Sequence, residues 1–186
     1  MRDLNWKTIS SKYVYKDQWF IARADSCEMP DKRIVEPYYV LEFPDWCNVV
    51  VVTDDEKIIM VRQYRHAVGK TTIELPGGII DKNETPVQAA TREVLEETGY
   101  AITNLQLLYT TSPNPAINNN TAHFFIAKAT KQIVAQNTDP FEELDVLLLD
   151  KKEVLQMIER SEIIHGVQIG AIYAAYLALG WLEKRM

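Results

Sequence analysis

The chain has 186 residues, 47% of them hydrophobic, which is enough for the core of one domain and a small extra lobe. Its formal net charge of −6 argues against binding of long nucleic acids, but it suits an anionic small substrate if metal ions supply the positive charge. The N-terminal residues show no secretory pattern, and the most apolar stretch, 167–182, is short for a membrane span, so we expect a cytoplasmic protein that does not enter a membrane.

The first part of the chain is rich in strand signals. Apolar and β-branched runs separated by turn residues predict strands at 6–10, 13–15, 19–25 and 34–43. A few strands alone are marginally stable in water, so they must pack on the rest of the chain or on a second chain. We therefore expect an N-terminal β-lobe at 1–43 and a main domain at 44–186.

The main domain mixes strands and helices. The same signals predict strands at 49–53, 57–64, 72–75, 105–111, 121–129 and 144–149, and helices at 86–98, 151–160 and 167–183. Strands on both sides of a central helix, with helices at the end of the chain, predict an α/β fold with a mixed sheet packed between helices.

The ends of the central helix are well marked. Thr85 fits the N-cap position, Pro86 the first helical position and Gln88 the third, which completes a capping box. Gly99 supplies a left-handed stop. The face expected to pack on the sheet consists of Val87, Ala90, Val94 and Thr98.

Three glutamates, Glu93, Glu96 and Glu97, share one edge of this helix, because residues three and four apart are neighbours. We expect them a quarter-turn or more from the apolar face, at the rim of a groove. Like charges repel, and two of these lie in the last turn, where the helix dipole is already negative. Stability does not explain this arrangement, but Mg²⁺ does, since it binds a few carboxylate oxygens together with substrate phosphates. The alternative is a charged face exposed to solvent.

Residues 78–100 place these glutamates in a longer pattern: Gly, five residues, Glu, seven residues, then Arg-Glu-apolar-x-Glu-Glu-x-Gly and a last apolar position occupied by Tyr100. This spacing is the Nudix box, and the chain resembles a Nudix hydrolase. The resemblance implies a Nudix α/β/α sandwich over residues 44–186. The chain also resembles dimeric ADP-ribose pyrophosphatases, which carry an N-terminal β-lobe that is often exchanged between subunits, and this implies a homodimer formed through residues 1–43.

The resemblance also implies a metal site. Glu93 and Glu97 are expected to bind Mg²⁺, with Mn²⁺ as a substitute. Glu96 is expected as a further ligand or as a catalytic helper, and the Gly77 carbonyl often completes such a site.

Arg92 is expected among the catalytic residues as the holder of a carboxylate through a bidentate contact. Glu84 is the expected partner, and a structural salt bridge is the simplest interpretation. For Glu84, structural pairing and metal contact remain open.

The general base is expected outside the box, in the segment 138–143. By similarity to relatives in the ADP-ribose branch, Glu143 best fits the position that completes the metal cluster, and Glu142 is the alternative. A polar loop without a catalytic role is the competing interpretation.

Substrate contacts rest on short elements that resemble those of ADP-ribose and nucleoside diphosphate sugar hydrolases. Arg65 is expected to bind phosphate, because a guanidinium matches phosphate oxygens, and Glu74 to orient the substrate or the cluster. Asn118 is expected to contact a sugar hydroxyl, although turn formation explains it equally well. Pro115 has the downstream spacing of ADP-ribose pyrophosphatases, but Asn114 replaces their glycine, which argues against strict ADP-ribose specificity.

The sequence thus predicts a Mg²⁺-dependent hydrolase that cleaves the pyrophosphate bond of ADP-ribose or another nucleoside diphosphate sugar. The products would be a nucleoside monophosphate and a sugar phosphate, and the partner is a small nucleotide, not a nucleic acid. Two alternatives remain: a pyrophosphohydrolase of oxidised dNTPs, and a non-catalytic nucleotide-binding sensor.

Overall fold

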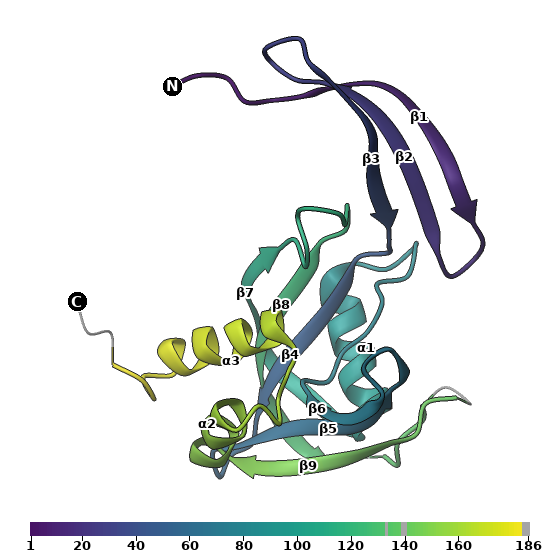
Figure 1. Ribbon diagram of the computed structural model, residues 1–186. Helices are drawn as coiled ribbons and strands as arrows, with labels where there is room; N and C mark the ends of the chain where they lie inside the picture. Colours follow the sequence, from purple (N-terminus) through teal and green to yellow (C-terminus); the bar gives the residue numbers. More distant parts are fainter. Residues whose placement is uncertain (133, 139–140, 184–186) are drawn as a thin grey trace. The chain divides into compact units, whose positions relative to one another are not determined.

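The computed structural model describes residues 1–132, 134–138 and 141–183. The chain forms two compact units (Figure 1). Unit 1 consists of Met1–Pro44 and Ser112–Thr121, and unit 2 of Asp45–Thr111 and Ala122–Met186.

Unit 1 is built on a three-stranded antiparallel sheet in the order β1-β2-β3. The strands are β1 (Lys7–Lys16), β2 (Ile21–Glu28) and β3 (Ile34–Glu42). The predicted strands 6–10 and 13–15 are one continuous strand in the structure. Its pairing with β2 shifts register at two places, and such irregularities, like β-bulges, allow one strand to continue where the alternation of apolar and polar residues is interrupted.

The loop 112–121 also belongs to unit 1. The N–H of Leu41 donates to the carbonyl of Ile117 at 2.8 Å. The hydroxyl of Tyr38 donates to the carbonyl of Ala116 at 2.7 Å, and the side-chain amide of Asn120 donates to the carbonyl of Pro44 at 2.9 Å. The loop is therefore held by the end of β3 and the residues that follow it.

Unit 2 contains a six-stranded mixed sheet in the order β6-β5-β4-β8-β7, with β9 paired to β5. Its strands are β4 (Trp46–Val52), β5 (Lys57–Arg65), β6 (Lys70–Glu74), β7 (Tyr100–Thr111), β8 (Ala122–Gln132) and β9 (Leu144–Asp150). The pair β4–β8 is parallel and the other pairs are antiparallel. The mixed sheet predicted from the order of elements is confirmed.

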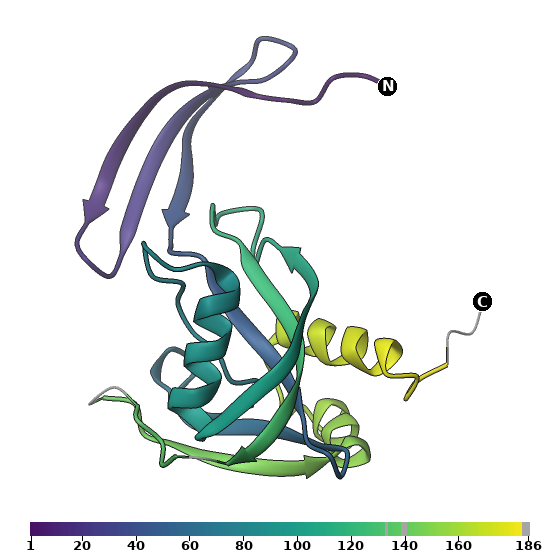
Figure 2. The same ribbon diagram turned by 180° about the vertical axis from the view of Figure 1, so that it is seen from behind.

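Helices cover both faces of this sheet. Successive residues of a strand face opposite sides, and β4 shows the consequence. Val49 and Val51 pack with Ala90 of α1 (Pro86–Thr98) in one core cluster. Val50 and Val52 pack in a second cluster with residues of α2 (Lys151–Glu159) and α3 (Gly166–Ala178). Figure 1 shows unit 2 from the side of α2 and α3, and Figure 2 from the side of α1.

Helix α3 is shorter than the predicted helix 167–183. Gly180 adopts a left-handed conformation with φ of 70°, and the N–H of Trp181 donates to the carbonyl of Tyr176 at 2.8 Å. This is a Schellman motif, which ends a helix although its sequence remains apolar. No helix in the described part of the chain is long and apolar enough to cross a membrane.

Helix α1 begins and ends as predicted, and three of the four residues predicted to pack on the sheet, Ala90, Val94 and Thr98, are buried. Thr85 and Gln88 form the reciprocal capping box, and Gly99 is left-handed. Val87, predicted to pack on the sheet, is 54% exposed, whereas Glu97, predicted at the rim, is 3% exposed. Val87 points in nearly the same direction as the buried Val94 and Thr98, so its exposure follows from its place in the first turn and not from a rotated face.

Candidate active site

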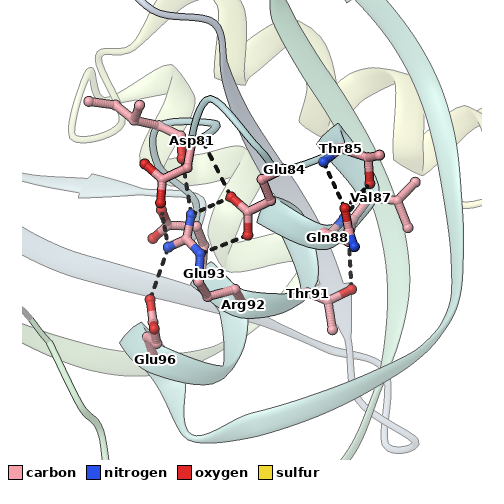
Figure 3. Close-up of polar contacts among 10 residues, drawn as sticks. Asp81, Glu84, Thr85, Val87, Gln88, Thr91, Arg92, Glu93 and Glu96 are labelled. Carbon is pink, nitrogen blue, oxygen red and sulfur yellow. Dashed lines mark hydrogen bonds and ion pairs between the residues drawn. The ribbon is translucent and has the colours of Figure 1, made fainter.

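Arg92 of α1 gathers three carboxylates around one guanidinium (Figure 3). Its Nε and Nη2 donate to the two carboxylate oxygens of Glu84 at 2.9 and 2.8 Å. Its Nη1 donates to Glu93 at 2.9 Å and to Glu96 at 3.0 Å. Its Nη2 also donates to the carbonyl of Ile79 at 3.1 Å. The hydrogen bond to Glu84 is the main reason why the pKa of Arg92 lies above its usual value.

Glu97 lies deeper in the unit, on the side of α1 that faces the sheet. One of its carboxylate oxygens accepts the N–H of Gly77 at 2.9 Å. The pKa of Glu97 is raised to about 8, mainly by burial; the hydrogen bond from Gly77 and the charge of Arg65 lower it, and the charges of Glu93 and Glu142 add to the rise. A buried acid with so few compensating partners is costly to ionise, which makes it a candidate for a cation ligand.

Glu93 shares this environment. Burial raises its pKa above the usual value, the hydrogen bond from Arg92 opposes the shift, and the charges of Glu96 and Glu142 add to it. Glu93 and Glu97 are thus two adjacent carboxylates, one turn apart, that are both harder to ionise than in water.

The turn Gly77–Gly78 packs tightly against these groups. Gly77 has a φ of 146°, and a Cβ there would lie 2.1 Å from the carbonyl oxygen of Cys47. A Cβ on Gly78 would lie 2.5 Å from a carboxylate oxygen of Glu93. Only glycine allows the backbone to approach the carboxylates this closely.

Arg65 and Glu74 form a second pair, on β5 and β6. Arg65 donates to both carboxylate oxygens of Glu74, at 2.9 and 2.7 Å, and Thr72 donates to one of them at 2.5 Å. Burial raises the pKa of Glu74, but the hydrogen bonds outweigh this effect and hold the pKa below its usual value. The Glu74 side chain is 5% exposed and that of Arg65 is 49% exposed, so the guanidinium still faces solvent.

The predicted general bases lie on an exposed loop before β9. The charge of Glu142 raises the pKa of both Glu93 and Glu97, which brings this residue within electrostatic reach of the cluster. Glu143 is exposed. Residues 139 and 140 of the predicted segment lie outside the described residues.

Asn118 is in the other unit. It lies on the loop 112–121 of unit 1, where it forms a β-bridge with Leu41 and its N–H donates to the carbonyl of Asn114 at 2.8 Å. The predicted site residues that the structure brings together in unit 2 are therefore the ones between positions 65 and 97, together with Glu142.

A family model described as NUDIX domain matches residues 46–165. The chain belongs to the NUDIX family. It is a hydrolase acting on pyrophosphate bonds, and enzymes of this family generally need a divalent metal ion. A second model, described as the N-terminal domain of nucleoside diphosphate sugar hydrolases, matches residues 6–41, which lie in unit 1.

Several known proteins are similar along most of their length. The NUDIX chain is 29% identical to the methanol dehydrogenase activator of Bacillus methanolicus, over 89% of this chain and 90% of that protein. It is 27% identical to the ADP-ribose pyrophosphatase of Bacillus subtilis (strain 168), over 88% of each. A crystal structure of an ADP compounds hydrolase has a TM-score of 0.85, covers 97% of this chain and 98% of that one, and is 18% identical. This match confirms the predicted fold class.

The donor set of the NUDIX box suits a hard cation. Among the described residues, no group of three or more Asp, Glu, His or Cys side chains is arranged to hold a metal ion. Mg²⁺ does not require such a group, since it is usually bound by one or two carboxylates, water and substrate phosphates. Glu97 supplies a buried carboxylate and Glu93 a half-buried one, and the charge of a cation would offset the repulsion between them.

The sequence did not predict a role at this NUDIX site for two buried residues. Asn48 and Gln168 are 4% and 2% exposed and hydrogen-bond to each other. The available signal was an amide inside the apolar strand Cys-Asn-Val-Val and another inside the apolar helix that closes the chain.

Proposed function

We propose that this NUDIX enzyme hydrolyses the pyrophosphate bond of ADP-ribose or another nucleoside diphosphate sugar, with Mg²⁺, to give a nucleoside monophosphate and a sugar phosphate. The observation that carries the proposal is the pair of carboxylates, buried Glu97 and half-buried Glu93, packed against the turn Gly77–Gly78. The match of residues 6–41 to the N-terminal domain of nucleoside diphosphate sugar hydrolases supports the substrate class.

Glu93 and Glu97 would hold the metal ion, with the Gly77 carbonyl and Glu96 as further candidate ligands. Bound Mg²⁺ would neutralise phosphate charge and favour a water as nucleophile. Arg92 keeps Glu84, Glu93 and Glu96 in fixed positions through its hydrogen bonds, so its role in the proposal is positioning.

For the general base we propose Glu143, with Glu142 as the alternative. The charge of Glu142 raises the pKa of Glu93 and Glu97, which supports its place among the candidates. Replacing each by glutamine separates them, because the base variant loses turnover by about 10²–10⁴-fold while the other retains most of it.

Arg65 is the proposed phosphate contact. Its guanidinium is fixed at one edge by Glu74, which leaves the rest of the half-exposed group to face a ligand. Asn118 remains a proposed contact to a sugar hydroxyl.

The proposed assembly is a homodimer formed through the N-terminal lobe, in the cytoplasm. Strand β1 and the turn after it expose large apolar side chains of a kind that a partner subunit would cover: Ile9, Tyr13, Val14, Tyr15 and Trp19. Light scattering coupled to size exclusion should give twice the chain mass at micromolar concentration; a monomer alone would refute the dimer.

A substrate panel with product identification tests the proposed function. ADP-ribose, GDP-mannose, UDP-glucose, NADH, diadenosine polyphosphates and oxidised dNTPs are incubated with Mg²⁺, and the Glu97→Gln variant serves as the control. We expect sugar phosphate and nucleoside monophosphate, with ¹⁸O from labelled water in one of them. Release of pyrophosphate from the dNTPs alone, or tight nucleotide binding without turnover of any compound, would refute the proposal in favour of a sanitising enzyme or a sensor.

A further inference from the structure

Two buried amide side chains, Asn48 of β4 and Gln168 of α3, meet within the core between the sheet and α3. Nε2 of Gln168 donates to Oδ1 of Asn48 at 3.2 Å. Val50 of β4 and Ala171 and Ile172 of α3 belong to the hydrophobic core cluster on this side of the sheet. A buried hydrogen-bonded pair contributes little more to stability than apolar side chains of the same shape would. Filling the core therefore does not account for this pair.

Both amides hold the main chain of residues 75–77, which connects β6 to the turn Gly77–Gly78. Oε1 of Gln168 accepts the N–H of Leu75 at 2.9 Å. Nδ2 of Asn48 donates to the carbonyls of Leu75 and Pro76 at 3.0 and 3.3 Å. The N–H of Val49 adds a bond to the carbonyl of Pro76 at 3.0 Å. The segment is thus fixed on one side by side chains from a strand and a helix 120 residues apart.

The next residue joins this network to the carboxylates. The space where a Cβ of Gly77 would lie is 2.7 Å from Nδ2 of Asn48, so the amide is packed directly against that glycine. On its other side the N–H of Gly77 donates to Glu97 at 2.9 Å. A displacement of the amide pair must therefore move the Gly77 peptide relative to the Glu97 carboxylate.

We propose that Asn48 and Gln168 are positioning residues of the metal site, which fix the Gly77 peptide and, through it, the Glu97 carboxylate. The affinity for the divalent ion then depends on side chains other than the carboxylates. This inference rests on the metal site at Glu93 and Glu97 that the proposed function assigns.

Two questions are tested separately: whether the metal site exists, and whether the amide pair affects it. Direct binding of Mn²⁺, followed by the electron paramagnetic resonance signal of the free ion, answers both without an activity assay. Wild type is first compared with Glu97→Gln. We expect the variant to lose at least one site; equal binding would overturn the metal site and this inference with it.

The second comparison uses Gln168→Met, which keeps the length of the side chain but leaves the N–H of Leu75 without its acceptor, and Asn48→Ser, which removes both amide donors. Because partners of metal-ligating groups typically change metal affinity by about 10–100-fold, we expect the Mn²⁺ dissociation constant to rise about tenfold in each. Tyr176→Phe is the matched control. It removes a hydrogen bond of 3.0 Å to the carbonyl of Lys151 from the same core cluster without touching residues 75–77, and it should bind Mn²⁺ as wild type does.

Circular dichroism first confirms that each protein is folded at the assay temperature. Unchanged affinity in both Gln168→Met and Asn48→Ser would overturn the inference while leaving the metal site standing. An equal loss of Mn²⁺ affinity in Tyr176→Phe would also overturn the inference, because any loss of core stability would then be enough to weaken Mn²⁺ binding. If neither amide variant folds, the pair serves stability alone and the inference fails.

Discussion

Replacing Glu97 by glutamine should make the metal-free protein more stable at alkaline pH. The folded carboxyl keeps its proton up to a pKa of about 8, whereas the usual value is 4.5. Between these values the folded state binds more protons than the unfolded chain, so the free energy of unfolding falls as the pH rises. Glutamine removes the ionisation and retains an oxygen for the N–H of Gly77.

The size of the effect follows from the two pKa values. The interval from 4.5 to about 8 corresponds to about 5 kcal/mol, at ~1.4 kcal/mol per pKa unit. This is a ceiling, because local opening lets water reach the carboxylate without unfolding the whole unit. We expect Glu97→Gln to exceed wild type by about 2–4 kcal/mol at pH 8 and to differ little at pH 5.

Urea denaturation in the presence of EDTA, repeated from pH 5 to pH 8.5, measures the difference. Glu96→Gln is the control, since that side chain is 36% exposed and bound to Arg92, and its stability should follow the wild-type pH dependence. Parallel curves for wild type and Glu97→Gln across the whole range would show that Glu97 ionises without cost, and the reasoning about its burial would be wrong.

Three further outcomes are expected. Gly77→Ala should lower stability by about 3 kcal/mol or more, because its Cβ would collide with the Cys47 carbonyl. Gly69 has a φ of 65° and open space around it, so Gly69→Ala should lower stability by only ~1 kcal/mol. Equal melting temperatures for the two variants would contradict this. Arg65→Lys breaks the bidentate contact with Glu74 and should raise KM for a nucleoside diphosphate sugar about tenfold, whereas an unchanged KM in steady-state kinetics excludes a phosphate contact. Mg²⁺ should raise the melting temperature more at pH 8 than at pH 5.5, because bound carboxylates must be deprotonated; calorimetry giving equal shifts would argue against carboxylate ligands.

Local signals in the sequence predicted the ends of α1 well. The capping box of Thr85 and Gln88 and the stop at Gly99 depend on residues within one turn of each other, so their chemistry can be read directly from the sequence. The spacing of the box likewise placed Arg92 close to Glu84, and the bidentate pair is present.

Features set by tertiary packing were harder to predict. Ala90, Val94 and Thr98 of α1 are buried as predicted, but Glu97 is also covered and Val87 is not, because the position of the helix on the sheet, and not its pattern alone, decides which side chains are covered. The contact between Asn48 and Gln168 joins residues 120 positions apart, and no periodicity or motif reports such a pair. Gly180 was available in the sequence as a signal for the early end of α3, but the apolar residues around it favoured the prediction of a longer helix.

The loop between β7 and β8 ties the two units together in sequence. It is a connection within the sheet of unit 2, yet its backbone and side chains are bonded to β3 and the residues just after it. A recombination that replaced only the first 44 residues with those of a relative would separate these partners. A chimaera of two such enzymes therefore needs the N-terminal segment and this loop from the same parent.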